Sequence, residues 1–147
     1  MDVLYLDICC LKRPFDDQSD ARIRAEAAAV ADLFERAQAG GIRLVRSPAH
    51  RVENDANPRE DRRLATALWL DGFARDVQLT PDVEARARTL EGLGFSPLDA
   101  LHISFAEQAQ AAAFVTCDDR LVAKGARHAA ELKTRVLSPL DFPRMGA

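Results

Sequence analysis

Four acidic residues stand at positions from which their side chains could share one site. Asp7 and Asp118 each follow a short apolar run that is typical of a buried strand, and Asp99 lies in the first turn of a predicted helix. Glu53 lies in a short helical segment that begins after Ser47. Ligands of open parallel sheets bind beyond the carboxyl ends of the strands. We therefore predict that these four carboxylates converge at that edge of a sheet.

The chemistry of such a set is that of a divalent metal ion. Carboxylates a few ångströms apart raise one another's pKa values unless cations neutralise them. Oxygen-only ligands suit Mg²⁺ or Mn²⁺, which activate water and stabilise the oxyanions of a phosphoryl displacement. Each acid also has a purely structural interpretation: Asp118 as a helix N-cap, Asp99 as the acid of a capping box, and Glu53 as part of a solvated helix face.

The tetrapeptide Ser-Pro-Leu-Asp occurs twice, at Ser96–Asp99 and at Ser138–Asp141. A serine N-cap, a proline at the first helical position and an acid in the first turn together favour the start of a helix. Only the first copy is followed by helix-forming residues with an apolar row, whereas the second soon meets Pro143. We predict a substantial helix after the first copy alone.

Composition limits the class of protein. The 147 residues favour a single domain over residues 1–147, and the 48% hydrophobic and 29% charged content is ordinary for a globular chain. No apolar run approaches the roughly 20 residues that span a bilayer, and the N-terminal stretch carries acids instead of a basic signal-peptide flank. We expect a cytoplasmic protein with no membrane association. The net charge of -3 means that any nucleic-acid binding must depend on local arginines or bound cations.

The three cysteines show no familiar spacing. Cys9 and Cys10 are adjacent, Cys117 stands far along the chain, and no C-x-x-C pattern occurs. This pattern indicates neither a disulfide framework nor a zinc site. We expect reduced, mostly buried thiols that act as small apolar residues.

Short apolar runs alternate with amphipathic segments along the chain. Strands are predicted at 3–6, 42–45, 77–79, 113–116 and 135–137. Helices are predicted from Asp20 to Gly40, after Ser47, at 59–75, from Thr80 to 92–94, after Ser96, and at 118–130. The segment between the first strand and Asp20 is predicted to be a loop. This alternation predicts an α/β fold with a parallel sheet covered by helices on both faces.

Five segments, taken in order, resemble PIN-domain proteins and in particular VapC-like ribonucleases, the toxins of type II toxin–antitoxin systems. They are "YLDICCLKRPFDD", "SPAHRVENDANP", "PLDALHISFAE", "FVTCDDRLV" and "VLSPLDF", and they extend over nearly the whole chain. The resemblance implies a three-layer α/β/α fold with a parallel sheet of about five strands. It also implies an Mg²⁺- or Mn²⁺-dependent endoribonuclease that acts on RNA, forms homodimers and is inhibited by an antitoxin protein.

The resemblance places the family's four acidic residues, both catalytic and metal-binding, at Asp7, Glu53, Asp99 and Asp118. Asp55 lies two residues after Glu53, but residues two apart on a helix face different directions, so only one should point into the site. Cys9 departs from the pattern, because many relatives have Ser or Asn at that position. A thiol is a weak hydrogen-bond partner, which predicts a weakened metal site.

Other polar residues are assigned to the substrate. Arg13 and Arg120 are predicted to bind its phosphates, because a guanidinium can contact a phosphodiester through two hydrogen bonds. Thr116 is included with them as a residue that hydrogen-bonds within the acidic site. His102 lies three residues after Asp99, on the same helical face, and is predicted to be a packed histidine instead of a general base.

Two further functions compete with the ribonuclease. The first is a non-catalytic module of the same fold that binds RNA or a protein partner, which Cys9 and the acidic net charge favour. The second is an aspartate-nucleophile phosphatase, which is disfavoured because Cys9 stands where Asp-x-Asp chemistry requires a second acid. Trp69 and Phe73 are predicted to pack in the core or in an interface, not to stack on bases.

Overall fold

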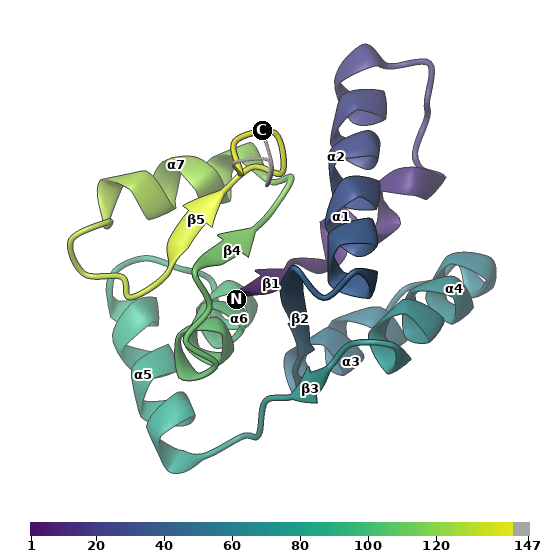
Figure 1. Cartoon of the computed structure of the whole chain (residues 1–147). Helices are drawn as coiled ribbons and strands as arrows, with labels where there is room; N and C mark the ends of the chain where they lie inside the picture. The colour runs from purple at the N-terminus through teal and green to yellow at the C-terminus, as the bar shows by residue number, and fades with distance from the viewer. Residues whose placement is uncertain (143–147) are drawn as a thin grey trace.

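The computed structural model describes residues 1–142 and contains a five-stranded sheet between helices (Figure 1). In spatial order the strands are β3 (Arg75–Asp76), β2 (Ile42–Arg46), β1 (Asp2–Leu6), β4 (Ala113–Val115) and β5 (Arg135–Leu137). Neighbouring strands are all parallel. The first strand of the chain is therefore the central one, with two strands on either side of it.

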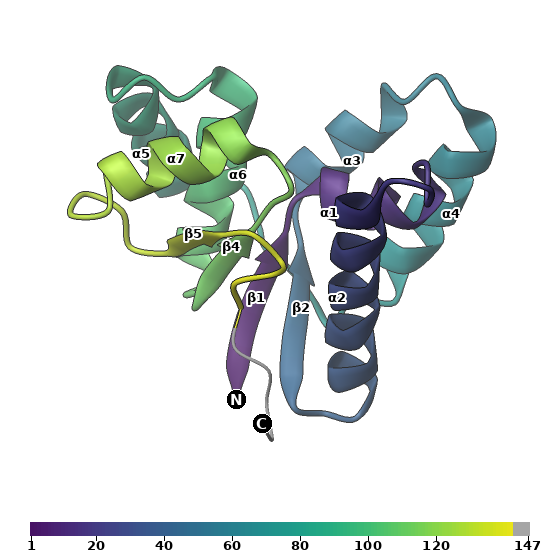
Figure 2. The ribbon, with the colours of Figure 1, turned by 90° about the horizontal axis from the view of Figure 1, so that it is seen from above.

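Helices cover both faces of this sheet. They are α1 (Ile8–Lys12), the 3₁₀ helix η1 (Arg13–Phe15), α2 (Ala21–Gln38), α3 (Pro48–Asp55), α4 (Glu60–Asp71), α5 (Pro81–Gly92), α6 (Pro97–Gln108) and α7 (Asp119–Arg127). Figure 2 shows α5, α6 and α7 on one side of the strands and α1, α2 and α4 on the other. The predicted three-layer α/β/α fold with a parallel sheet of five strands is confirmed.

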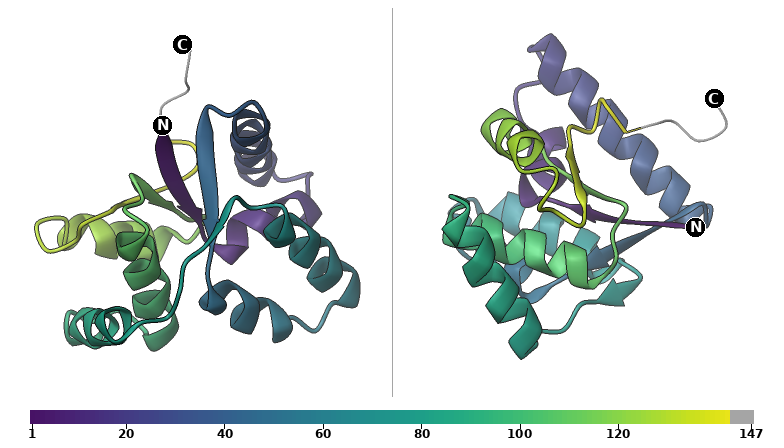
Figure 3. Two further views of the ribbon diagram at one scale, coloured as in Figure 1. Left: turned by 60° about the horizontal axis from the view of Figure 1, so that its bottom comes forward. Right: turned by 90° about the vertical axis from the view of Figure 1, so that its left-hand side faces the viewer.

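The central strand carries the core on both of its faces. Leu4 and Leu6 point into one hydrophobic cluster together with Val30 of α2, while Tyr5 points into a second cluster together with Phe105 of α6. Successive side chains of a strand face opposite ways, and all three of these β1 residues are fully buried. Figure 3 shows β1 and β2 side by side between the two groups of helices. Burial on both faces explains why this strand is a continuous apolar run.

The sheet register brings the ends of the strands to one edge. Leu6 pairs with Val115, and the N–H of Asp7 donates to the Val115 carbonyl at 2.8 Å. The next residues along the two strands, Asp7 and Thr116, are therefore neighbours. Ser47 follows β2 at the same edge and begins α3. Parallel pairing alone thus places the residues after β1, β2 and β4 beside one another.

The predicted loop after the first strand contains a short helix instead. Helix α1 begins directly after Asp7, whose Oδ1 accepts a hydrogen bond from the Ile8 N–H at 2.9 Å. Ile8 and Leu11 are fully buried and hold the helix against the core. Five residues are too few to show a helical period in the sequence, so pattern reasoning missed this element.

Three other predicted boundaries were wrong. Helix α4 ends at Asp71 and not at residue 75, because Arg75 belongs to β3. The third strand covers Arg75–Asp76 instead of 77–79, and Val77 follows it as a buried core residue whose N–H still donates to the Arg46 carbonyl at 2.8 Å. An ion pair of 2.6 Å between Arg46 and Asp76 holds this edge strand to β2. Helix α7 ends at Arg127 and not at residue 130, because His128 leaves the helical conformation.

The two Ser-Pro-Leu-Asp copies differ as predicted. The first begins α6, where Ser96 caps the helix and its Oγ accepts the Asp99 N–H at 3.2 Å. The second forms a turn, in which the Asp141 N–H donates to the Ser138 carbonyl at 3.0 Å. Pro143, which was expected to end any helix there, lies outside the described residues.

His50 fixes α3 against the end of the central strand. Its ring stacks on Tyr5 at a centroid distance of 4.3 Å, its Nε2–H donates to the Leu6 carbonyl at 2.7 Å, and its Nδ1 accepts the Ser47 N–H at 3.1 Å. Burial and, to a smaller extent, nearby His102 lower the pKa of His50 to about 3. The neutral ring therefore serves as both donor and acceptor in the core.

We predict that His50→Gln weakens the dependence of stability on pH. The unfolded chain protonates His50 near its ordinary pKa of about 6.5, whereas the folded chain does so only near 3, so stability is lost as the pH falls through this window. The contribution is up to about 1.4 kcal/mol per pH unit. Urea unfolding between about pH 7 and pH 4 should give a smaller slope for the variant than for the wild type. Equal slopes would show that His50 binds its proton over the same pH range in the folded and the unfolded chain.

Helix α7 approaches β5 closely at Gly125. A Cβ atom placed there would lie 2.5 Å from the Cβ of Val136. We predict that Gly125→Ala lowers stability by roughly 1–3 kcal/mol, seen as a lower melting temperature. Gly92→Ala is the matched control, because nothing lies within 4 Å of a Cβ at that helical position. Its melting temperature should be unchanged or higher, and equal losses in both variants would refute the close-approach argument.

Candidate metal centre

Asp7 is a buried carboxyl group at the end of β1, with 7% of its surface exposed. Its Oδ1 accepts the Ile8 N–H, and its Oδ2 accepts the Thr116 hydroxyl at 2.8 Å. Burial raises the pKa of Asp7 well above its usual range, and Cys9 and Glu53 raise it further, while the Thr116 hydrogen bond acts in the opposite direction. A cation beside this carboxyl would favour its ionised form.

Glu53 is held in place by a chain of buried hydrogen bonds. Its Oε1 lies 3.1 Å from His102 Nε2, His102 Nδ1 lies 2.6 Å from the Tyr5 hydroxyl oxygen, and that oxygen lies 2.6 Å from Ser47 Oγ. An ionised carboxylate only accepts hydrogen bonds, so Nε2–H donates to Glu53 and Nδ1 accepts from Tyr5. His102 is fully buried. It is the packed, satisfied histidine that the sequence predicts, and it orients Glu53.

Potential ligand atoms of Asp7, Glu53 and His102 all lie within 4.8 Å of one another. These residues come from β1, α3 and α6, which are far apart in the chain. Asp99 is half-buried in the first turn of α6. Burial raises the pKa of Asp99, and the neighbouring carboxylates of Asp118 and Glu53 raise it further. The Asp99 carboxyl group therefore interacts electrostatically with two of the other predicted site residues.

Asp118 joins the site through Thr116. Its N–H donates to Thr116 Oγ1 at 3.1 Å, the same oxygen whose hydrogen is donated to Asp7. The Asp118 carboxylate caps α7 by accepting the N–H groups of Arg120 and Leu121 at 3.0 and 3.3 Å. The side chain is exposed at the start of that helix. The structure thus groups Asp7 and Glu53 with His102, whereas Asp99 and Asp118 lie outside that group and approach it from the starts of α6 and α7.

The acids beside these four lie in other environments. Asp119 forms an ion pair with Arg22 of α2, with Oδ2 2.9 Å from Nη1. Asp55 is exposed at the last residue of α3, two positions after Glu53. Glu53, and not Asp55, contacts buried His102, as the helical geometry predicts.

The predicted substrate residues lie in different settings. Arg120 is exposed at the start of α7, next to Asp118. Arg13 forms ion pairs with Asp16 at 2.9 Å and with buried Glu26 at 3.4 Å, so its charge is used inside the fold. Thr116 is fully buried and reaches the site only through its hydrogen bonds.

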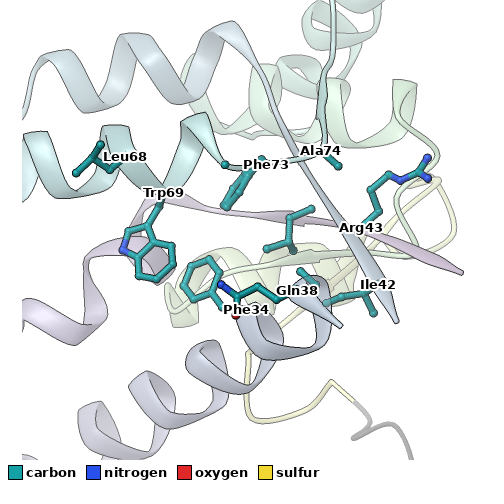
Figure 4. Close-up of a pocket in the computed structure, with 11 residues that line it drawn as sticks. Phe34, Gln38, Ile42, Arg43, Leu68, Trp69, Phe73 and Ala74 are labelled. Atoms are coloured by element: carbon teal, nitrogen blue, oxygen red, sulfur yellow. The ribbon is translucent and has the colours of Figure 1, made fainter. Parts of the chain in front are cut away.

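An apolar pocket of about 320 Å³ lies between α2, β2 and α4, and none of the four acids lines it (Figure 4). Phe34 stacks on Trp69 at a centroid distance of 4.2 Å, and buried Phe73 completes this aromatic group. Trp69 is 39% exposed, so part of its ring faces solvent. These contacts fit the predicted core or interface role of Trp69 and Phe73.

Comparison with known proteins finds similar folds among solved structures. No family model and no curated protein matches the sequence. Among solved structures, FitAcB from Neisseria gonorrhoeae matches with a TM-score of 0.56 over 95% of this chain and 99% of that chain. The chain has a PIN-like fold. At 16% identity the likeness establishes the fold alone. It does not assign the chain to the VapC-like ribonucleases.

The PIN-like chain contains no helix within residues 1–142 that is long and apolar enough to cross a membrane.

We predict that Asp7→Asn stabilises the metal-free protein at neutral pH. Because burial raises the pKa of Asp7, the ionised carboxyl costs folding free energy, and this cost grows as the pH rises through the folded pKa. The amide retains an acceptor for the Ile8 N–H. In EDTA the melting temperature should rise by roughly 2–4 °C for each kcal/mol relieved, and the difference should shrink toward about pH 4. A lower melting temperature at neutral pH would show that the ionised form stabilises the fold.

Proposed function

We propose that this protein is a divalent-metal-dependent endoribonuclease that hydrolyses RNA phosphodiester bonds. The observation that carries the proposal is the grouping of the Asp7 and Glu53 carboxylates with His102 at the carboxyl edge of a PIN-like sheet, with Asp99 and Asp118 near them and the pKa values of Asp7 and Asp99 raised. Carboxyl groups whose pKa values are raised in the metal-free protein are typical of sites that bind a ligand.

The donor set fits an oxygen-preferring cation. Asp7, Glu53, Asp99 and Asp118 would hold Mg²⁺ or Mn²⁺, since these ions prefer carboxylate ligands. Such an ion, when bound, stabilises phosphoryl oxygens and makes water more acidic. The chain's own contribution is preorganisation: Thr116 holds Asp7, and His102 holds Glu53. These hydrogen bonds reduce the side-chain reorganisation needed on binding.

The substrate phosphates are proposed to lie beside α7. Arg120 is exposed next to Asp118, at the start of α7, where the helix dipole favours anions. Arg13 would have to exchange its ion pairs with Asp16 and Glu26 before it could bind a phosphate. Thr116 acts by positioning Asp7, because its side chain is fully buried.

The biological setting is proposed to be that of a toxin restrained by an antitoxin. The resemblance of the sequence to VapC-like ribonucleases implies this setting, and the fold that the chain shares with FitAcB agrees with it. We propose further that the protein works in the cytoplasm and forms a homodimer.

A binding module without catalytic activity is the second candidate. Cys9 stands two residues after Asp7 and contacts Thr116 at 3.3 Å, where a stronger hydrogen-bonding group is expected in an active member. Arg13 is occupied by internal ion pairs. Both observations would be explained by a fold that binds RNA or a protein without cleaving RNA.

We predict RNA cleavage that requires Mg²⁺ or Mn²⁺ and stops in EDTA. Asp99→Asn should abolish it, because the substitution removes an anionic ligand while an oxygen remains to accept hydrogen bonds. Folding should survive, at a cost of at most about 1 kcal/mol. The measurement is cleavage of mixed RNAs by purified variants, with melting curves in the presence and absence of Mn²⁺.

Asp141→Asn is the matched control, since Asp141 lies in the turn formed by the second Ser-Pro-Leu-Asp copy. It should cleave like the wild type. Full activity in Asp99→Asn, or a folded but inactive Asp141→Asn protein, would refute the site assignment. RNA binding without cleavage in every metal would favour the binding module.

A further inference from the structure

The three cysteines of the sequence lie together in the fold. They form a cluster beside the acidic residues, and none of their sulfur atoms belongs to the acidic site. Cys9 and Cys10 are carried by α1, and Cys117 lies in the link from β4 to α7. Their sulfur atoms all lie within 4.8 Å of one another, and no disulfide joins them. Neither the spacing nor the odd number of cysteines indicated this grouping, because parallel pairing of β1 with β4 creates it.

The sulfur positions are close to those of a metal site. The Sγ atoms of Cys10 and Cys117 are 3.8 Å apart. Two sulfurs bound to one tetrahedral ion at about 2.3 Å would themselves be about 3.8 Å apart. Cys9 Sγ is held at the same place by the Cys117 N–H, which donates to it at 3.2 Å. Small movements would bring all three thiols to one ion.

The surroundings of the thiols bear on the charge and the access of such a site. The Arg13 side chain lies beside Cys117, and its charge is paired with Asp16 and Glu26. A divalent ion would therefore offset the thiolate charge itself, balancing two of the three thiolates. Cys10 and Cys117 are buried, whereas Cys9 is only partly buried and provides a route from solvent.

We propose that Cys9, Cys10 and Cys117 form a binding site for a thiophilic divalent cation of the Zn²⁺ or Cd²⁺ class, with one coordination position left for water or an exogenous ligand. Each thiol that binds loses its proton to the solvent, and no oxidant or reductant is needed. Thiolate sulfur selects soft cations, whereas the neighbouring carboxylates select Mg²⁺ or Mn²⁺. The two sites are therefore separated by ligand chemistry, and this inference does not depend on the proposed ribonuclease activity.

The test is titration of the full-length, reduced protein with Cd²⁺ in excess Mg²⁺. We expect one equivalent to produce ultraviolet sulfur-to-metal charge-transfer absorption, which carboxylate binding does not give. X-ray absorption at the cadmium edge of the wild-type complex should show three sulfur neighbours. This second measurement needs no variant. A shell of oxygen atoms, fewer than three sulfurs, or no charge-transfer band would overturn the proposal.

Variants locate the ion. Cys9→Ser and Cys117→Ser should each weaken Cd²⁺ binding by more than the roughly 10- to 100-fold that follows loss of an outer-shell partner. Asp99→Asn is the matched control, because it changes the acidic site and leaves every thiol in place; its Cd²⁺ affinity should equal that of the wild type. Far-UV circular dichroism checks that each variant is folded. Equal Cd²⁺ affinity in the wild type and both folded serine variants would assign the ion elsewhere.

Discussion

The candidate site depends on one costly placement, a carboxyl group buried at the end of the central strand. Leu4, Tyr5 and Leu6 are fully buried, and the chain reaches Asp7 before it can return to solvent. Burying a carboxylate is unfavourable unless hydrogen bonds or a cation compensate for the lost hydration. Two hydrogen bonds compensate in part, and the raised pKa of Asp7 shows that a cost remains.

The elements around Asp7 are arranged by hydrogen bonds that also build the fold. The Thr116 hydroxyl accepts a hydrogen bond from the Asp118 N–H and donates one to Asp7. The register of β1 and β4 therefore sets the distance between Asp7 and Asp118. Tyr5 connects the core to His102, which donates to Glu53. The contacts that pack the core thus also set the geometry of the site. For this reason buried His102 can orient Glu53 from within the core.

Arg13 shows how ion pairing within the fold can occupy a side chain that the sequence assigns to a ligand. Arg13 was predicted to bind a phosphate, and in the fold its charge is paired with Asp16 and Glu26. A single guanidinium near the surface can bind an external anion or internal ones, and burial of Glu26 favours the internal pairing.

The sequence by itself determined most of the elements and the chemical identity of the candidate site. The apolar runs predicted four of the five strands, and Ser96 and Asp20 marked helix starts that the structure contains. Asp7, Asp99 and Asp118 were picked out because each follows a strand or begins a helix, and Glu53 lies in the short helix after Ser47. These are local properties, which short-range hydrogen bonding and side-chain periodicity record. Only the tertiary structure decided that Glu53 rests on His102, that Arg13 is paired internally, and that Cys117 meets Cys9 and Cys10. Those contacts join residues about 13 to 108 positions apart, and strand pairing and helix packing bring them together, which no local pattern encodes.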